Sequence, residues 1–220
     1  MALTAAASGL RELIARARAL VFDFDGTLVD SNPIKFRAFE RCFADLDERR
    51  EEVLAYCLGH HHVPRSEKFR HVYERILERP YTDEVARRLH ARFELATTDA
   101  IIRAPATPGA EDFLAALRGR MTALLSSTPH DVLLRILAGR GWPGFFSVVQ
   151  GAPVAKAEWL RAFCADRGLP AERVLFFGDT PEDRAAARAA GCRFIAVRSS
   201  GSGRGGALAD FTSLGVACLR

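Results

Sequence analysis

An apolar run followed by two acidic residues, at positions 19–25, constrains this chain more than any other stretch. Ala19-Leu20-Val21-Phe22 is long enough for a buried strand, and Asp23 and Asp25 follow it directly. On an extended segment these two carboxylates point to the same face. An ionised carboxylate at the end of a buried strand needs a cation or hydrogen-bond donors. The pair therefore favours a charged site over a strand end with two solvated acids.

The composition is typical of a globular protein with one core and room for a small second domain. Of the 220 residues, 49% are hydrophobic and 26% are charged, and the net charge is +4. No apolar run approaches the roughly 18 residues of a membrane span, and charged residues interrupt the alanine-rich start, which argues against a secretory signal. Arginines alternate with acids and form no basic stripe for nucleic acid. We expect a cytoplasmic protein with neither a membrane nor a nucleic-acid partner; the oligomeric state stays open.

Two residue types are used in an informative way. The five cysteines form no Cys-x-x-Cys pair, and we expect reduced core thiols at Cys42, Cys57, Cys164, Cys192 and Cys218. Nearly all basic residues are arginine, and the lysines are Lys35, Lys68 and Lys156. Because a lysine is a compact point charge that arginine does not replace, these three positions are candidates for specific roles.

The stretch from residue 33 to residue 104 is predicted to be helical throughout. Apolar residues recur at helical spacing from Ile34 to Leu46. A second helix ends at Gly59, a third runs from about Ser66 to Leu77 with Ser66 as its expected cap, and a fourth runs from Thr82 to about Ile102. No strand pattern interrupts them, so this stretch is expected to form a small helical domain.

After a Pro-rich and Gly-containing linker at 104–109, strands alternate with helices. The expected strands are Thr122–Ser126, Phe145–Val149, Val174–Gly178 and Phe194–Val197, with helices near 109–118, 130–139, 155–167 and 181–190. This pattern predicts an α/β, Rossmann-like parallel sheet of about five strands with helices on both faces. The core would comprise residues 1–32 and 105–220, with the helical domain of residues 33–104 inserted after the first strand. Ligands of such sheets bind beyond the carboxyl ends of the strands.

The segment from Asp23 to Ser31, Asp-Phe-Asp-Gly-Thr-Leu-Val-Asp-Ser, resembles the first motif of the haloacid dehalogenase superfamily, most of whose members are phosphatases. The resemblance implies that Asp23 is a nucleophile that forms an aspartyl-phosphate. It implies that Asp25 is the general acid for the leaving oxygen and later the base for water. Because related ATPases, dehalogenases and phosphonate hydrolases lack this second acid, Asp25 favours phosphate-ester hydrolysis or mutase chemistry.

Two further segments resemble the second and third motifs of that superfamily. Residues 123–129 imply that Ser126 hydrogen-bonds a phosphoryl oxygen and that the N–H of Ser127 adds a donor. A Ser-Thr-Pro turn that caps the next helix is the alternative. Residues 150–156 imply that Lys156 balances the charge of Asp23 and of the phosphoryl group, whereas a surface lysine is the alternative.

Residues 174–183 resemble the fourth motif of the superfamily. They form an apolar strand that ends in Gly-Asp, with a second Asp four residues later. This resemblance implies that Asp179 ligates a metal and that Asp183 does so directly or through water. With the carboxylate of Asp23 and the carbonyl of Asp25, these oxygens would form a site suited to Mg²⁺. Each motif taken alone also has a structural explanation that involves no catalysis. The occurrence of all four in this order favours phosphatase chemistry.

The helical domain lies where that superfamily places a small cap, and one of its loops resembles a cap loop. The Gly…Val-x-Arg pattern of residues 59–65 resembles the loop of the sugar-phosphate mutase and phosphatase branch, which implies that Arg65 meets the substrate. Lys68 and His62 are further candidates. The run His60-His61-His62 favours structural or substrate-facing histidines over a zinc site, since zinc ligands need tetrahedral convergence.

The sequence therefore predicts a Mg²⁺-dependent phosphatase that hydrolyses a small phosphorylated metabolite, with a sugar phosphate as the first choice. A β-phosphoglucomutase-like phosphotransferase shares every motif and differs in whether water reaches the aspartyl-phosphate. A phosphate-binding regulator without turnover is the alternative from another class. The intact set of Asp23, Asp25, Lys156 and Asp179 argues against that regulator.

Overall fold

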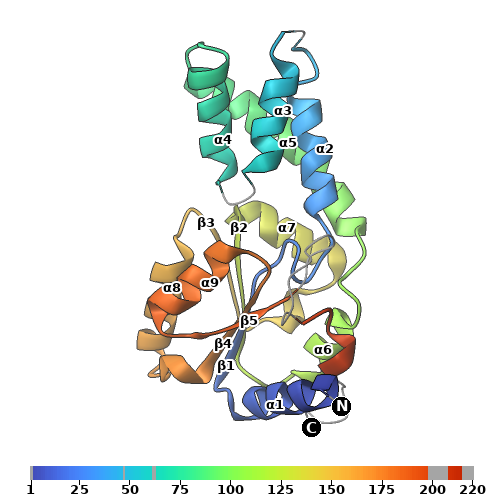
Figure 1. Cartoon of the computed structure of the whole chain (residues 1–220), viewed down its shortest axis with the longest axis vertical. Helices are drawn as coiled ribbons and strands as arrows, with labels where there is room; N and C mark the ends of the chain where they lie inside the picture. The colour runs from blue at the N-terminus through green and yellow to red at the C-terminus, as the bar shows by residue number, and fades with distance from the viewer. Residues whose placement is uncertain (1, 47, 61–62, 198–207, 215–220) are drawn as a thin grey trace. The chain divides into compact units, whose positions relative to one another are not determined.

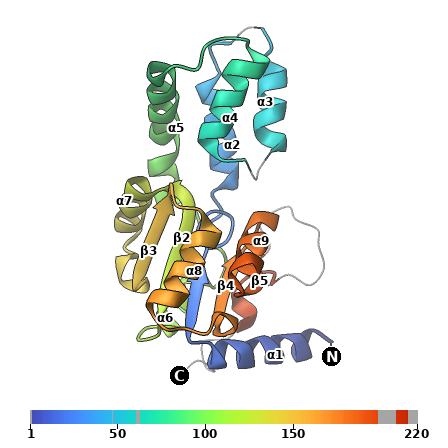
Figure 2. The same cartoon turned by 90° about the vertical axis from the view of Figure 1, so that its left-hand side faces the viewer.

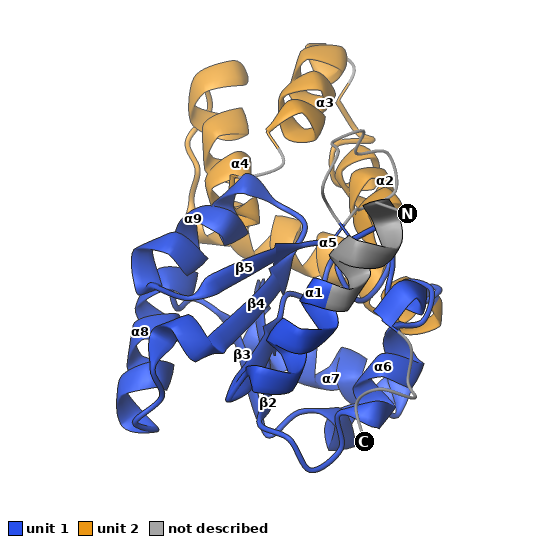
Figure 3. Ribbon diagram, turned by 60° about the horizontal axis from the view of Figure 1, so that its bottom comes forward, with its two compact units in different colours: residues 1–30, 104–220 blue, residues 31–103 orange. Residues whose placement is uncertain are grey.

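The computed structural model describes residues 2–46, 48–60, 63–197 and 208–214 (Figure 1). The chain divides into two compact units: unit 1 comprises residues 1–30 and 104–220, and unit 2 comprises residues 31–103 (Figure 3). Within the described ranges, no helix combines the length and the apolar character that crossing a membrane requires.

Unit 1 is built on a five-stranded parallel sheet, which confirms the predicted α/β class. The strands are β1 (Ala19–Phe22), β2 (Thr122–Pro129), β3 (Val148–Ala152), β4 (Val174–Gly178) and β5 (Arg193–Ala196), in the order β3-β2-β1-β4-β5. Every residue of β1 is buried, as expected for the central strand of a sheet with helices on both faces. The chain runs outward from β1 through β2 to β3 and then returns to β4 on the other side of β1. This reversal is the kind of switch point at which such sheets bind ligands.

Helices α1 (Ala2–Arg16), α6 (Ala110–Ala116), α7 (His130–Arg140), α8 (Lys156–Asp166) and α9 (Pro181–Ala190) accompany the sheet (Figure 2). Helices α8 and α9 cover one face, where Leu160 packs in the same cluster as Phe176 of β4. On the other face Phe22 stacks on Phe177 with ring centroids 4.9 Å apart, and Phe113 of α6 contacts both rings. Because successive strand residues point to opposite faces, β1 and β4 contribute to both cores.

Unit 2 consists of α2 (Asn32–Cys42), α3 (Arg50–Gly59), α4 (Arg65–His71), a π-helical turn (Val72–Ile76) and α5 (Asp83–Arg103). Its described residues contain no strand. The helices share a core in which Phe39 of α2 meets Phe93 of α5 edge-on at 5.0 Å and Phe69 of α4 at 5.8 Å. This aromatic centre gives unit 2 an apolar core of its own.

Two local predictions were wrong. Strand β3 begins at Val148, three residues later than predicted, because residues 143–145 form a 3-10 turn that starts at Pro143. Ser66 is not the cap of its helix. Helix α4 already begins at Arg65, and the carbonyl of Pro64 accepts the first intrahelical hydrogen bond, from the N–H of Lys68 at 3.0 Å. Pro64 has an extended ψ of 144° and occupies the cap position, so the first helical residue is Arg65.

The described cysteines are free and buried; they are Cys42, Cys57, Cys164 and Cys192, while Cys218 lies outside the described residues. Burial raises the pKa of the Cys57 and Cys192 thiols to about 12. These thiols are therefore protonated and pack as small apolar side chains.

Candidate active site

The candidate site lies at the carboxyl ends of three neighbouring strands of unit 1. In the central strand, Phe22 pairs with Leu124 of β2 on one side and with Phe177 of β4 on the other. Asp23 follows β1 directly, so this register brings it to the same edge as Ser126 and Asp179. Asp23 is 5% exposed and Ser126 is 2% exposed, so the edge is buried where these side chains meet.

The loop after β1 keeps Asp25 close to this edge. Gly26 has a φ of 81°, a left-handed conformation that favours glycine, and its N–H donates to the carbonyl of Val29 at 2.8 Å. Asp25 forms an isolated bridge with the same Val29. The chain therefore turns tightly after Asp25, and Thr27 is completely buried in the turn.

Lys156, the first residue of α8, connects two of the acids. Its Nζ lies 2.6 Å from Oδ1 of Asp23 and 2.6 Å from Oδ1 of Asp183. Burial alone would lower the pKa of this ammonium, but the two carboxylates outweigh burial and raise the pKa above its ordinary value. Lys156 is thus a permanently charged group held by two short, charge-assisted hydrogen bonds.

Asp183 is fixed by its place in the first turn of α9, where it is 1% exposed. Its Oδ2 accepts a hydrogen bond from the backbone N–H of Thr180 at 3.3 Å, and its own N–H donates to the hydroxyl of Thr180 at 3.1 Å, which makes a capping box. The same Oδ2 also accepts a hydrogen bond from the hydroxyl of Thr180 at 2.7 Å. A Cβ atom at Gly178 would lie 2.7 Å from the Cβ of Asp183, so only glycine leaves room there. The two oxygens of Asp183 are therefore oriented, one toward Lys156 and the other toward Thr180.

Three carboxylates of the site are arranged as a metal-binding group. Asp23, Asp179 and Asp183 each offer an oxygen, and these atoms lie within 4.8 Å of one another. Burial is the main cause that raises the pKa of Asp23 to about 8 and that of Asp179 to about 6; neighbouring carboxylates add to the shift and Lys156 opposes it. The single ammonium of Lys156 does not balance three carboxylates, so the buried site has an excess of acidic groups. An all-oxygen donor set with excess negative charge fits a hard divalent cation such as Mg²⁺.

Three threonines of the site were missed by the sequence analysis. The hydroxyl of Thr27 lies 3.4 Å from Oδ2 of Asp23 and 3.3 Å from Oδ1 of Asp179. Thr180 caps α9, and the hydroxyl of Thr128 donates to Oδ2 of Asp25 at 2.8 Å. A signal for Thr128 was available, because it stands two residues after Ser126 and so shares its side of an extended strand.

The structure brings most of the predicted site residues of unit 1 together. They are Asp23, Asp25, Ser126, Lys156, Asp179 and Asp183. The side chain of Ser126 accepts the N–H of Thr128 at 3.1 Å and lies 3.4 Å from Oδ2 of Asp25. Ser127 is exposed, and the predicted contact with the phosphoryl group involves its backbone N–H, not its side chain.

The predicted substrate residues of unit 2 have partners inside that unit. The guanidinium of Arg65 lies 3.6 Å from Glu94 and stacks over the ring of Phe93 at 4.7 Å. The ammonium of Lys68 is buried and donates to the carbonyl of Cys57 at 2.8 Å. His62 lies outside the described residues. These contacts show that Arg65 and Lys68 contribute to the packing of unit 2.

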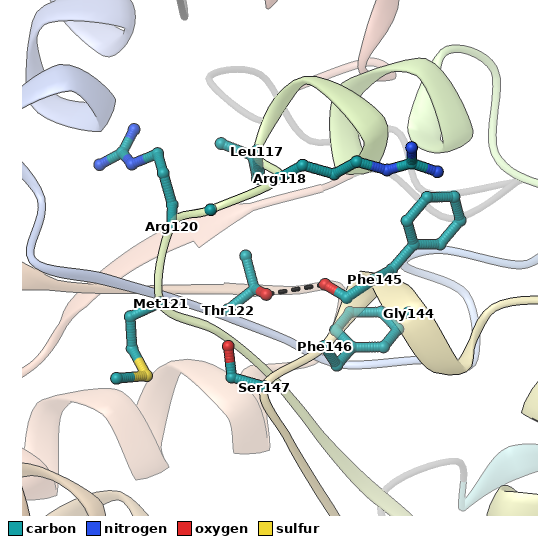
Figure 4. A pocket seen from close by; sticks show the side chains of 10 residues that line it. Leu117, Arg118, Arg120, Met121, Thr122, Gly144, Phe145, Phe146 and Ser147 are labelled. Atoms are coloured by element: carbon teal, nitrogen blue, oxygen red, sulfur yellow. Dashed lines mark hydrogen bonds between the residues drawn. The ribbon is translucent and has the colours of Figure 1, made fainter.

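A cavity of about 400 Å³ opens at the other end of β2, near its first residue Thr122 (Figure 4). Figure 4 shows the hydroxyl of Thr122 directed at the carbonyl of Phe145, which accepts its hydrogen bond at 2.7 Å. Arg118 and Arg120 also line this cavity. It lies at the amino end of a strand whose other end carries Ser126, so it is separate from the acidic site.

Comparisons with known proteins agree with one another. The family model described as haloacid dehalogenase-like hydrolase matches residues 17–191. The phosphoglycolate phosphatase of Synechococcus elongatus is 32% identical over 189 residues, which cover 82% of this chain and 83% of that protein. A plasmid-encoded phosphoglycolate phosphatase of Cupriavidus necator is 32% identical over 203 residues, covering 86% and 84%. The crystal structure of CbbY from Rhodobacter sphaeroides with phosphate covers 92% of this chain and 99% of that one, with a TM-score of 0.71 and 22% identity, and it is evidence for the fold.

Proposed function

Since the chain belongs to the haloacid dehalogenase-like hydrolases and is a phosphoric monoester hydrolase, we propose that it is a Mg²⁺-dependent phosphatase of a small phosphorylated metabolite, with Asp23 as its nucleophile. The observation that carries this proposal is the contact of Lys156 with both Asp23 and Asp183 at 2.6 Å, inside a buried group of three carboxylates. A phosphoryl group brings further negative charge. Such a site needs a fixed cation beside the nucleophile, and Lys156 is in that position.

The proposed reaction has two steps on this set of side chains. A carboxylate oxygen of Asp23 attacks the phosphorus, the bond from phosphorus to the leaving oxygen breaks, and Asp25 gives its proton to that oxygen. Water then attacks the phosphorus of the aspartyl-phosphate, Asp25 takes the proton of the water, and the Asp23 carboxylate is released together with inorganic phosphate. Ser126 and the backbone N–H of Ser127 hydrogen-bond the phosphoryl oxygens, and Lys156 offsets their charge.

The residues proposed to hold Mg²⁺ are Asp23, Asp179 and Asp183 together with the carbonyl of Asp25. The excess of carboxylates over ammonium groups supports this assignment. The ion, when bound, offsets carboxylate and phosphoryl charge and orients the phosphate. Thr27 supports the same group, since its hydroxyl approaches both Asp23 and Asp179.

We propose further that residues 1–32 and 105–220 form the catalytic core, and that residues 33–104 act as the cap that selects the substrate. In this proposal Arg65, Lys68 and His62 serve the part of the substrate that does not react. The ion pair of Arg65 with Glu94 is a competing explanation for why that arginine is present. The two explanations predict different kinetics for an Arg65→Ala variant.

The first substrates to assay are 2-phosphoglycolate and sugar phosphates. The names of the two relatives at 32% identity support the former, and the resemblance of the loop at residues 59–65 supports the latter. A panel of these esters with Mg²⁺ should show release of inorganic phosphate from at least one of them at a rate that saturates. Hydrolysis of none would contradict the proposal. Transfer of phosphate between sugar positions, without release of phosphate, would instead identify a mutase.

A further inference from the structure

Asp25 meets two hydroxyl groups of β2, and the two contacts differ in quality. The Oγ1 of Thr128 donates to Oδ2 of Asp25 at 2.8 Å, whereas the Oγ of Ser126 lies 3.4 Å from the same oxygen. Hydrogen bonds from a hydroxyl to an oxygen are normally about 2.5–3.0 Å long. The contact with Thr128 is therefore well formed and the contact with Ser126 is weak.

The loop around Asp25 determines where its backbone lies. The hydrogen bond from Gly26 to Val29 and the bridge from Asp25 to Val29 both involve main-chain groups. The direction of the carboxylate depends instead on the side chains that it meets, and Thr128 is a partner that comes from another strand. Thr128 and Asp25 are 103 residues apart in the sequence, so the fold is what brings them into contact.

Thr128 presents its hydroxyl from a rigid support. Its N–H donates to the Oγ of Ser126 at 3.1 Å, and the next residue, Pro129, pairs with Ala152 of β3. The main chain of β3 lies directly against it, since a Cβ atom at Gly151 would be 2.5 Å from the carbonyl oxygen of Thr128. A β-branched side chain on such a backbone has few rotamers. The hydroxyl is thus held in place before Asp25 meets it.

We propose that Thr128 is a positioning residue for the catalytic carboxyl group of Asp25. This inference rests on the proposed function, in which Asp25 exchanges protons with the leaving oxygen and with water. The two hydroxyl groups near the carboxyl end of β2 then have different roles. Ser126 hydrogen-bonds the phosphoryl group, and Thr128 orients Asp25. Misplacing a reacting group by about 1 Å costs up to about a hundredfold in rate, so loss of this contact should affect the step that needs the proton.

Two aryl esters of similar shape provide the test, namely phenyl phosphate and p-nitrophenyl phosphate. Phenolate is a strong base and needs a proton as it leaves, whereas p-nitrophenolate leaves without one. Thr128→Val keeps the branched shape and removes the hydroxyl. It should lower kcat for phenyl phosphate by about ten- to a hundredfold with KM within about twofold. Single-turnover release of p-nitrophenolate, which is measured before water must attack, should fall by less than about threefold.

Variants separate positioning from a general effect on the fold. Thr128→Ser retains a hydroxyl and should recover activity to within about threefold of the wild type. Thr122→Val is the matched control, because it removes a hydroxyl that donates at 2.7 Å to Phe145 at the other end of the same strand. It should lower thermal stability and leave kcat for both esters near the wild-type value. Thr128→Ala is measured beside Thr128→Val, so that the result does not depend on how one side chain packs.

Combining Thr128→Val with Asp25→Asn separates a failure of the positioning role of Thr128 from a failure of the proposed function. If Thr128 acts through Asp25, the double variant Asp25→Asn/Thr128→Val is no slower than Asp25→Asn alone. Equal losses for both esters, a Thr128→Ser variant as slow as Thr128→Val, or additive losses in the double variant would overturn the positioning role. Wild-type activity in Asp25→Asn would overturn the proposed function instead. A silent Asp25→Asn beside a fully active Thr128→Val would overturn only the inference about Thr128.

Discussion

The ammonium of Lys156 lies 2.6 Å from Oδ1 of Asp23, although 133 residues separate them in the chain. This contact ties the start of α8 to the end of the central strand. It also places the positive charge of Lys156 beside the proposed nucleophile. Since Asp183 holds the same ammonium from α9 at 2.6 Å, Lys156 links three elements of unit 1.

The first prediction concerns this lysine. Lys156→Met should lower turnover by at least a hundredfold and lower the melting temperature, because Asp23 and Asp183 would lose their shared counter-ion. Removing one partner of a buried ion pair costs about 3–5 kcal/mol. Arg161→Met is the control, since Arg161 is an exposed cation on the same helix whose Nε donates to the carbonyl of Ala189. Turnover in Lys156→Met close to that of Arg161→Met would remove Lys156 from the mechanism.

The second prediction separates the activity of Asp23 from its effect on stability. Asp23→Asn should abolish turnover, because an amide does not attack phosphorus, while circular dichroism should show an intact fold. Phosphate release and circular dichroism are measured on the same preparation. Activity within tenfold of the wild type would contradict the role of Asp23 as nucleophile.

The third prediction is the pH dependence of the metal-free protein. Burial is the main cause that raises the pKa of Asp23 from 3.8 to about 8, so the folded state holds a proton that the unfolded state releases across that window. The free energy of unfolding should therefore fall as the pH rises from about 4 to about 8. Asp23→Asn removes this carboxylate, and its melting temperature in EDTA should exceed that of the wild type at pH 8. At pH 5 the difference should shrink; a constant difference would contradict the assignment.

The fourth prediction concerns Mg²⁺. EDTA should stop hydrolysis, Mg²⁺ should restore it, and Asp179→Ala should raise the Mg²⁺ requirement steeply. Protons compete with the ion for Asp23 and Asp179, whose pKa values are raised to about 8 and about 6. The rise in melting temperature on adding Mg²⁺ should consequently be larger at pH 8.5 than at pH 5.5. A ligand at 100 times its Kd stabilises by about 2.7 kcal/mol. Full activity in chelator would rule out the proposed ion site.

The fifth prediction tests whether Arg65 contacts the substrate or only stabilises unit 2. If Arg65 binds the part of the substrate that does not react, Arg65→Ala should lower kcat/KM for the physiological ester by about ten- to a hundredfold and leave p-nitrophenyl phosphate almost unaffected. Glu94→Gln is the matched control, because it removes the ion pair at 3.6 Å and keeps the arginine. Equal losses for both esters, or the same losses in both variants, would mean that Arg65 acts through the packing of unit 2.

The sequence by itself determined the order of the elements and the residue types of the site. Apolar runs and helical spacing are local patterns, so they predicted the sheet of unit 1 and the helices of unit 2. Asp23 and Asp179 could be placed at one edge because each follows a buried strand directly. Neighbouring residues explain the two wrong predictions. Pro143 opens a 3-10 turn, so β3 begins later, and Pro64 takes the cap position, so α4 begins at Arg65, one residue ahead of Ser66.

Only the tertiary structure decided which side chains contact one another. The contact of Thr128 with Asp25 depends on how β1 and β2 align, and the two contacts of Lys156 depend on how α8 and α9 pack on the sheet. The pairing of Arg65 with Glu94 likewise depends on the packing of α4 against α5. Periodicity shows the face on which a side chain lies. Its hydrogen-bond partner depends on how distant segments are positioned relative to one another. Those positions arise from the close packing of the whole core, which no local stretch of sequence contains.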